Sequence, residues 1–520
     1  MESGPILAIP PFPGARPPRF AELGGTTSPD PGREALLLAL AHHRVGGCYW
    51  GRQRALPSSA FVLDGTGDQG ADTVVWSQAD DPWHLLAHAE FARLKEDDPR
   101  AILALAAGVP LVLLATDGTV RDAGAQDATR WAKTLLTDWR FRNPFGGADL
   151  SVMEAIALCG FWRQMIDANR QIHSVMGIAY WKKPTVTPLL WAGVDVPYNR
   201  SLSAMPQGTA VALWRSRLSA AQARMMEQVQ PAVMEIEDGF IRSQGLGADC
   251  VPPLSIIVDA LGPHFAPGAP SQLENLLQDG HFPPDLLDRA RALRGAIIAA
   301  GLSKYETGAV GRLSRPGGSR RHVLVPGQVE DDRAVTSGGA LSSNLELLRR
   351  ARAVVGPEAF LIYKPHPDVT AGHRRGRIPD SDMMALANSA DTTSAMPALI
   401  AMVDELHVNS SLAGFEALLR GKAVTVHGVP FYAGWGLTTD LGPVPARRTA
   451  HRTLDEVIAA ALLLYPRYLD PETGLPAPAE VLVERLSGKS IPTPDLRQST
   501  IIASRRLQGR MRAGLSRWLG

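Results

Sequence analysis

The chain has 520 residues, of which 45% are hydrophobic and 20% charged, a composition typical of a folded globular protein with more than one domain. The formal net charge of +1 provides no global positive field, so no nucleic-acid partner is expected. The cysteines Cys48, Cys159 and Cys250 lack metal-ligand spacing, and their odd number does not suit a disulfide framework.

The N-terminal sequence has neither the charged start nor the long apolar stretch of a signal peptide. No run of about 18 apolar residues occurs anywhere in the chain, so no membrane-spanning helix is expected. We therefore expect a cytoplasmic protein.

The first part of the chain predicts a mixed accessory region. Residues 1–33 are rich in proline and glycine, which predicts a poorly ordered lead. Residues 34–150 combine helical patterns at 33–43 and 83–95 with an apolar run at 109–115, and they suggest no particular fold. From 151 to 176, apolar residues recur every three or four positions, which predicts a helix with one buried stripe.

The rest of the chain alternates strand and helix patterns twice, with a basic, glycine-rich break at 312–321. Strands are predicted at 211–214, 233–236, 255–259, 322–325, 360–364, 404–408 and 423–427, and helices at 271–278, 284–300, 341–353 and 412–420. This alternation predicts an α/β protein with two Rossmann-like domains, 151–311 and 312–450, whose parallel sheets face each other across a cleft. Residues 451–520 are expected to add C-terminal helices.

Polar residues that follow strands matter most, because such folds bind ligands at the carboxyl ends of their strands. After the strand at 233–236 come Glu237, Asp238, Arg242 and Ser243. These side chains could bind sugar hydroxyls or an acidic sugar's carboxylate. The alternative is an ordinary turn, since Asp-Gly is a common turn pair.

The strand at 322–325 leads into Gln328 and three consecutive acids that end at Asp331 and Asp332. A carboxylate at a sugar's anomeric carbon can act as nucleophile or base. A solvated acidic loop is the other interpretation.

Two prolines surround a histidine in Lys364-Pro365-His366-Pro367. Because proline restricts the backbone, this segment predicts a rigidly presented imidazole that can donate a hydrogen bond to phosphate. A structural loop histidine and a metal site with His373 are the alternatives, although the spacing matches no metal motif.

The strand at 404–408 runs into Asn409, Ser410 and Ser411, and a helix follows that carries Glu416. Serine and asparagine are good N-caps, and the same geometry turns backbone N–H groups toward a phosphate. Glu416 lies about one helical turn further on, where it could accept hydrogen bonds from ribose hydroxyls.

Together these segments resemble the capsule polysaccharide biosynthesis family of retaining β-Kdo transferases, where Kdo is an acidic sugar. The matching blocks are EDGFIRSQGLG (237–247), PPLSIIVDALG (252–262), LSKYE (302–306), VLVPGQVEDD (323–332), YKPHPDV (363–369), NSSLAGFEALLRGK (409–422) and GVPFYAGWGLTTD (428–440). No block is repeated, so the resemblance implies a single catalytic module.

The resemblance implies a GT-B-like fold, a CMP-Kdo donor and transfer with retention. It implies donor-binding roles for Gln328, Lys364, His366, Pro367, Asn409, Ser410, Ser411 and Glu416. Asp332, with Asp331 as its rival, becomes the candidate nucleophile. Glu237 and Asp238 become candidate acid/base groups, and Arg242, Ser243, Lys304 and Tyr305 candidate sugar or acceptor contacts. No metal or cofactor is implied.

Two departures from the family pattern, at Glu306 and at Trp214-Arg215, bear on acceptor binding more than on donor binding. The expected partners are a CMP-sugar donor and a glycan or glycolipid acceptor. Residues 496–520 carry six arginines, no acid and an apolar helical stripe, which favours peripheral inner-membrane contact or docking on the protein itself. The alternatives are a sialyltransferase-like or other GT-B sugar-nucleotide enzyme and a non-catalytic scaffold of a capsule assembly or export complex.

Overall fold

The computed structural model describes residues 4–24, 29–57, 61–66, 73–243, 251–303, 313–372 and 374–488. Internal contacts divide the chain into two compact units. Unit 1 comprises Met1–Ile172, Thr187–Pro197 and Thr473–Pro476, and unit 2 comprises His173–Val186, Tyr198–Glu472 and Ala477–Gly520. Every described residue of the candidate site belongs to unit 2, which contains two sheets of six strands each.

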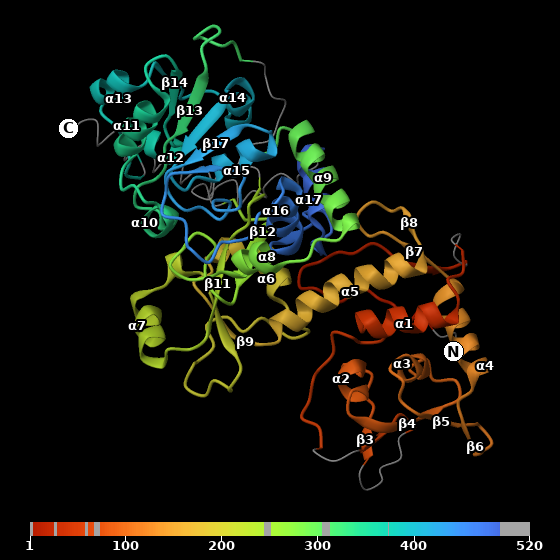
Figure 1. The fold of residues 1–520 in the computed structure, drawn as a ribbon. Helices are drawn as coiled ribbons and strands as arrows, with labels where there is room; N and C mark the ends of the chain where they lie inside the picture. Colours follow the sequence, from red (N-terminus) through yellow and green to blue (C-terminus); the bar gives the residue numbers. More distant parts are fainter. Residues whose placement is uncertain are drawn as a thin grey trace. The chain divides into compact units, whose positions relative to one another are not determined.

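Unit 1 is built around a five-stranded sheet of order β3-β2-β4-β5-β6 (Figure 1). Its strands are β2 (Phe61–Asp64), β3 (Thr73–Val75), β4 (Ala89–Lys95), β5 (Leu111–Leu114) and β6 (Val120–Asp122), of which only the β5–β6 pair is antiparallel. The helices are α1 (Arg33–His43), α2 (Pro82–Leu86), α3 (Ala101–Ala106), α4 (Ala125–Ala132) and α5 (Val152–Asn169).

The expectation of a poorly ordered lead is wrong for the described part of residues 1–33. Leu7, Phe12 and Phe20 are buried, and β1 (Ala21–Leu23) pairs with β7 (Trp139–Arg142), which in turn pairs with β8 (Asp149–Leu150). Proline prevents helix formation here, but it does not prevent an extended segment from burying its apolar side chains.

Two segments that the sequence predicts to be helical each include a strand in the structure. In the 83–95 pattern, α2 ends at Leu86 and β4 follows, with Ala92 and Leu94 buried on one face and Arg93 and Lys95 more exposed on the other. In the 151–176 pattern, Ser151 and Glu154 form a capping box for α5, but the helix ends at Asn169. The next segment is β9 (Ile172–Met176), a fully buried strand of unit 2's first sheet, where burial on both faces hides the period of two.

The C-terminal sheet of unit 2 is parallel throughout and has the order β15-β14-β13-β16-β17-β18. Its strands are β13 (His322–Pro326), β14 (Phe360–Lys364), β15 (Ser389–Ala390), β16 (Glu405–Val408), β17 (Ala423–Val426) and β18 (Thr439–Asp440). Numbered from its own first strand, the sheet reads 3-2-1-4-5-6, the order of the doubly wound nucleotide-binding fold.

Helices cover both faces of this sheet, because its strands are added first toward β15 and then toward β18. Figure 1 shows α11 (Asn344–Val355) and α13 (Asp380–Leu386) on one side and α14 (Met396–Met402) and α15 (Leu412–Leu419) on the other. Alternate residues of the strands face the two layers. Val325 packs with the α11 cluster, whereas Leu324 packs with the cluster that contains α14 and α15.

The first sheet of unit 2 is mixed, so the expectation of two parallel sheets is wrong for this half. Its order is β20-β19-β12-β11-β10-β9, with β10 (Ala210–Leu213) parallel to β11 (Val233–Asp238). Strand β12 (Ser255–Asp259) is antiparallel to both β11 and β19 (Arg467–Leu469), and β20 (Pro476–Ala477) forms the edge. Strand β12 pairs with β11 directly, since the Gly239 N–H donates to the Ser255 carbonyl. A parallel pair would need a crossover helix, and the described part of the 239–254 connection contains none.

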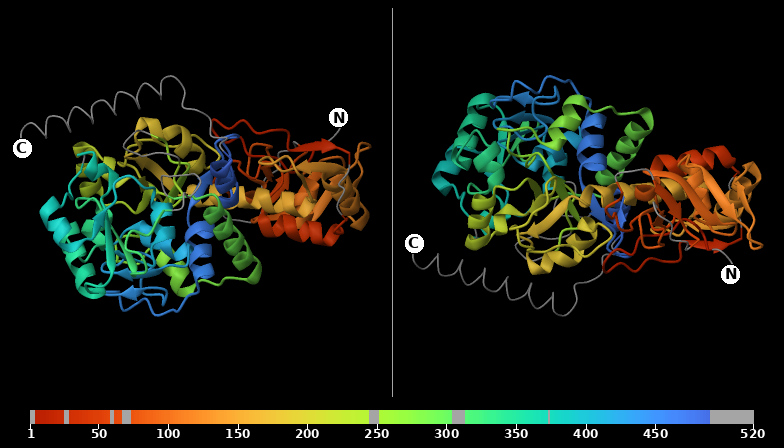
Figure 2. Two further views of the ribbon diagram at one scale, coloured as in Figure 1. Left: turned by 90° about the horizontal axis from the view of Figure 1, so that it is seen from above. Right: turned by 90° about the horizontal axis from the view of Figure 1, so that it is seen from below.

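The C-terminal segment returns to this first half. The helices α16 (Leu454–Ile458) and α17 (Ala479–Ser487) contact α9 (Pro284–Ala299), and the blue helices run beside the green α9 in every view (Figures 1 and 2). Helix α8 (Gln272–Asp279) begins at the N-cap Ser271. Residues 496–520 lie outside the described part, so their amphipathic helix stays a prediction. Within the part that is described, no helix is both long and apolar enough to cross a membrane.

Candidate functional site at the ends of the two sheets

The direction of strand addition reverses between β13 and β16, and doubly wound folds bind their ligands at such a topological switch point. Gln328 follows β13, and Ser410 follows β16. The Gln328 side-chain amide donates to Ser410 Oγ at 3.1 Å, and its oxygen accepts from the Ser410 backbone N–H at 3.0 Å. Ser410 Oγ in turn donates to the Ala334 carbonyl at 2.9 Å. Two predicted donor-binding residues therefore meet at this point and join the two loops.

Asn344, which the sequence analysis did not select, fixes the loop that carries Gln328. Its side-chain oxygen accepts from Gln328 N–H at 2.8 Å, and its amide donates to the carbonyls of Gln328 at 2.7 Å and Gly376 at 2.8 Å. Asn344 is only 4% exposed, so water cannot replace these bonds.

Replacing Asn344 by alanine should lower the free energy of unfolding by about 2–3 kcal/mol, because buried backbone groups would lose their partners. Urea unfolding followed by circular dichroism measures this change. The matched control is Asn388→Ala, which removes an amide near the sheet's other end, where Asn388 Oδ1 accepts from Leu361 N–H. The resemblance implies a CMP-sugar donor, and we expect only Asn344→Ala to weaken the binding of CMP as well. Unchanged stability would show that Asn344 does not hold this loop.

The other residues of the β16–α15 turn mainly support the backbone. Asn409 exchanges side-chain hydrogen bonds with Leu341, donating to its carbonyl at 2.9 Å. Ser411 is the N-cap of α15 and accepts from Ala413 N–H at 3.2 Å. The predicted N-cap is confirmed, and the N–H groups of the first turn of α15 remain the candidates for binding phosphate.

The segment after β14 presents His366 as the N-cap of α12 (Pro367–Thr370), with Pro367 at the first helical position. His366 Nδ1 accepts from the Asp368 N–H at 3.1 Å, so a neutral imidazole carries its proton on Nε2. Lys364 is buried, and its Nζ donates to the Ser394 carbonyl at 2.6 Å. This segment therefore offers the Nε2–H of His366 as a hydrogen-bond donor, whereas the Lys364 ammonium is already bonded to a backbone carbonyl.

The acidic loop after β13 lies at the surface. Asp332 is the N-cap of α10 (Arg333–Gly338), and its carboxylate accepts from Ala334 N–H at 2.9 Å. Asp331 is exposed and pairs with Arg374 at 3.2 Å. Because Asp332 follows Gln328 by four residues, it belongs to the same loop as the Gln328–Ser410 contact.

Arg333 connects this loop to the first sheet. Its Nη1 lies 2.7 Å from Glu237 Oε1 and 3.5 Å from Glu235 Oε2. The two glutamates lie two positions apart on β11 and therefore on one face of the strand. Burial raises the pKa of Glu237 to about 7, an effect that Arg333 opposes and the charges of Asp238 and Glu235 reinforce. A carboxyl poised near neutral pH suits general acid–base chemistry.

Asp238 contacts a second group of cations. Arg242 Nε lies 3.1 Å from its carboxylate and Lys182 Nζ 3.5 Å, while Arg242 also donates to Ser243 Oγ at 2.9 Å. Burial lowers the pKa of Lys182 to about 8, against the attraction of Asp238. Lys182 Nζ also lies 3.2 Å from the centroid of the Trp214 ring. Arg242 is fully buried, and its contacts with Asp238 and Ser243 stabilise the turn that follows β11.

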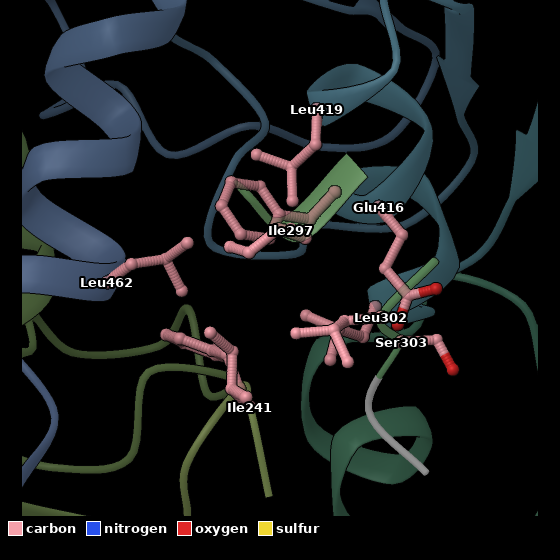
Figure 3. A pocket seen from close by; sticks show the side chains of 10 residues that line it. Ile241, Ile297, Leu302, Ser303, Glu416, Leu419 and Leu462 are labelled. Carbon is pink, nitrogen blue, oxygen red and sulfur yellow. The ribbon is translucent and has the colours of Figure 1, made fainter. Parts of the chain in front are cut away.

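Glu416 lies at the wall of an apolar cavity in which Ser303 is its neighbour and Leu462 lies opposite (Figure 3). The cavity has room for about one water molecule, with a volume of about 20 Å³. Glu416 itself is 8% exposed. Its proposed ribose contact stays a prediction.

Several expectations fall outside the described residues, namely those for Lys304, Tyr305, Glu306 and His373. The sequence analysis missed Arg333, Glu235 and Asn344 as parts of this site. Arg333 could have been found from its position directly after Asp332, and Glu235 from its spacing of two from Glu237. Nothing in the pattern indicates that both glutamates share one arginine.

Fold and site together define a doubly wound α/β protein whose parallel sheet has a nucleotide-binding strand order. A cluster of titratable side chains, which includes Glu237 and Lys182, lies in the same unit. A family model described as "Capsule polysaccharide biosynthesis protein" matches residues 209–468, half of the chain. The chain belongs to this capsule polysaccharide biosynthesis family, as the resemblance of its motifs predicts.

Two curated relatives support the assignment. The capsule polysaccharide modification protein LipA of Neisseria meningitidis serogroup B is 36% identical over 68% of this chain and 51% of its own length. The lipopolysaccharide-processing protein LpsZ of Rhizobium meliloti is 37% identical over 64% of this chain and 78% of its own. The chain thus spans about half the length of the Neisseria relative that it matches.

A solved structure shares both sequence and fold with this chain. It is described as Thermosulfurimonas dismutans KpsC, beta Kdo 2,4 transferase, and is 32% identical with a TM-score of 0.53. The match covers 61% of this chain and 99% of that one.

Proposed function

We propose that this chain is a retaining glycosyltransferase that moves Kdo from CMP-Kdo to a glycan or glycolipid acceptor in surface polysaccharide synthesis. The observation that carries the proposal is the similarity to a β-Kdo 2,4 transferase along 99% of that structure, at 32% identity. The two sheets of unit 2 would then be the two halves of a GT-B-like fold. The donor would bind at the switch point of the parallel sheet.

In this proposal the CMP phosphate lies near His366 and the start of α15. The Nε2–H tautomer of His366 can donate to a phosphate oxygen, and the N–H groups after Ser411 add the positive end of a helix dipole. Both stabilise the charge that develops on CMP as it leaves. Gln328 and Ser410 keep the two loops at the spacing that the nucleotide needs.

The chemistry would proceed by two displacements. The Asp332 carboxylate attacks the anomeric carbon of Kdo, and the bond to the phosphate oxygen breaks, so CMP leaves with the electron pair. An acceptor hydroxyl then attacks the same carbon and displaces the carboxylate, while Glu237 takes the hydroxyl proton. Two inversions give retention. Arg333 adjoins Asp332 in the chain and its side chain contacts Glu237, so it links the loop of the candidate nucleophile to the candidate base.

Replacing His366 by alanine should lower the turnover of CMP-Kdo by about 10²–10³-fold, the loss expected for one preorganised donor. Stopped assays of CMP release measure this. His366→Asn provides a partial control, because asparagine can retain the N-cap of α12. An unchanged rate in His366→Ala would restrict His366 to a structural role.

Calorimetry with CMP-Kdo, CMP-sialic acid and CMP tests the donor assignment. We expect CMP-Kdo to bind more tightly than CMP-sialic acid, and CMP to compete with it. Preference for CMP-sialic acid would support the sialyltransferase-like alternative, and failure of all three to bind would favour the scaffold.

A further inference from the structure

Unit 2 contains a pocket of about 270 Å³ beside the Glu235–Arg333 contact. Arg215, Val233 and Glu235 form one side of it, and the loop at 261–269, with Leu261 and Pro263, forms the other. Small-molecule sites have volumes of about 300–1,000 Å³. The pocket therefore suits one sugar residue rather than a whole nucleotide sugar.

Arg215 pairs with Glu235, the other charged residue that lines this otherwise apolar pocket. Its Nε and Nη2 both lie 2.6 Å from Glu235 Oε1, while Glu235 Oε2 faces Arg333. One carboxylate thus partners two guanidinium groups. The Arg215 side chain is 48% exposed, and a guanidinium has more N–H donors than one carboxylate oxygen can accept. The arginine can therefore bind a second oxyanion from the pocket.

The pocket adjoins the candidate base. Val233, Glu235 and Glu237 follow one another on the same face of β11, and the first two line the pocket. At about 3.3 Å per residue, Glu237 lies roughly 7 Å beyond Glu235 along the strand. A sugar in the pocket would reach from Arg215 to the carboxyl that titrates near neutral pH. Arg333 Cζ lies 5.2 Å from the ring centroid of Phe265, which belongs to the loop that lines the pocket. Arg333 therefore adjoins both this loop and Glu237.

We propose that this pocket is the acceptor subsite, in which Arg215 binds the carboxylate of an acidic sugar and thereby presents that sugar's hydroxyl to Glu237. The inference rests on the proposed function and identifies the chemistry of its acceptor. Recognition depends on the planar guanidinium, which binds a carboxylate through two parallel hydrogen bonds.

Donor-free binding to the full chain tests the subsite. The probe is the methyl glycoside of Kdo, compared with its uncharged methyl ester by saturation-transfer NMR titration. In Arg215→Gln, affinity for the acid should fall by about 10- to 100-fold, while affinity for the ester stays within about twofold. Arg215→Lys should restore only part of the difference, since lysine keeps the charge and loses the planar fork.

The matched control is Arg224→Gln, which removes an exposed arginine of α7 (Ala220–Val229) outside the pocket and should leave both affinities unchanged. Equal binding of acid and ester by the unaltered protein, or equal binding of the acid by Arg215→Gln, would overturn the proposal. Binding of glycerol phosphate in place of the acid would also overturn it, by identifying the oxyanion as a lipid phosphate. Because no CMP-sugar is present, these results remain decisive even if CMP-Kdo is not the donor.

Discussion

Asparagine in place of Asp332 should reduce Kdo transfer by at least about a thousandfold, the scale of losing a covalent nucleophile. The substitution separates the structural role of Asp332, as the N-cap of α10, from its proposed role as the nucleophile. Asparagine caps a helix as well as aspartate does, so α10 and the adjoining Arg333 should keep their places. Asparagine cannot form the glycosyl ester. Acceptor-dependent CMP release, measured at saturating donor, gives the loss in kcat.

Asp331→Asn is the control for Asp332→Asn. It removes the neighbouring exposed carboxylate and its pair with Arg374, and should change the rate by less than about threefold, because exposed ion pairs contribute little. If Asp331→Asn abolished transfer while Asp332→Asn did not, the nucleophile would be Asp331. Full activity in both variants would remove this loop from the chemistry.

Glutamine in place of Glu237 should lower transfer by about 10²–10⁴-fold, the usual contribution of general acid–base catalysis. The sign of the pH dependence follows from the role. Burial raises the pKa of Glu237 to about 7, and a base must be deprotonated, so kcat/KM should rise with pH up to about 7 and then level off. In Glu237→Gln that rising limb should disappear together with most of the rate.

Glu346→Gln is a suitable control for Glu237→Gln, since it removes a partly exposed carboxylate on α11 that pairs with Arg350. Its pH profile should match that of the unaltered protein. A Glu237→Gln variant that retains the rising limb would assign the titration to another group. Lys182, whose pKa lies near 8, is the first to consider.

Four strands of the parallel sheet, β13, β14, β16 and β17, were predictable because each is a short apolar run between helical patterns. The predicted strand at 360–364 has the bounds of β14, and the predicted N-cap before α15 is present. The direction of β12 was not predictable, since a buried strand reads the same in parallel and antiparallel pairs. The two-residue strands β15 and β18 are too short to show any period.

The candidate site was predictable only in part for a related reason. Motifs indicate which side chains follow strands, and the β13–β16 switch point does bring Gln328 to Ser410. Arg333 reaches Glu237 across 96 residues of sequence, and only the packing of the two sheets brings them together. Asn344 resembles any helix-start residue in the sequence, yet in the structure it anchors the Gln328 backbone.

The most direct test of the account is acceptor-dependent CMP release from CMP-Kdo, with the product analysed by mass spectrometry and by NMR of its anomeric configuration. We predict one added Kdo residue per acceptor with the donor's β configuration retained, and no comparable release from CMP-sialic acid. An inverted product would contradict the double displacement at Asp332. Absence of transfer to every Kdo-terminated acceptor, from protein shown to be folded and to bind CMP-Kdo, would contradict the proposed function itself.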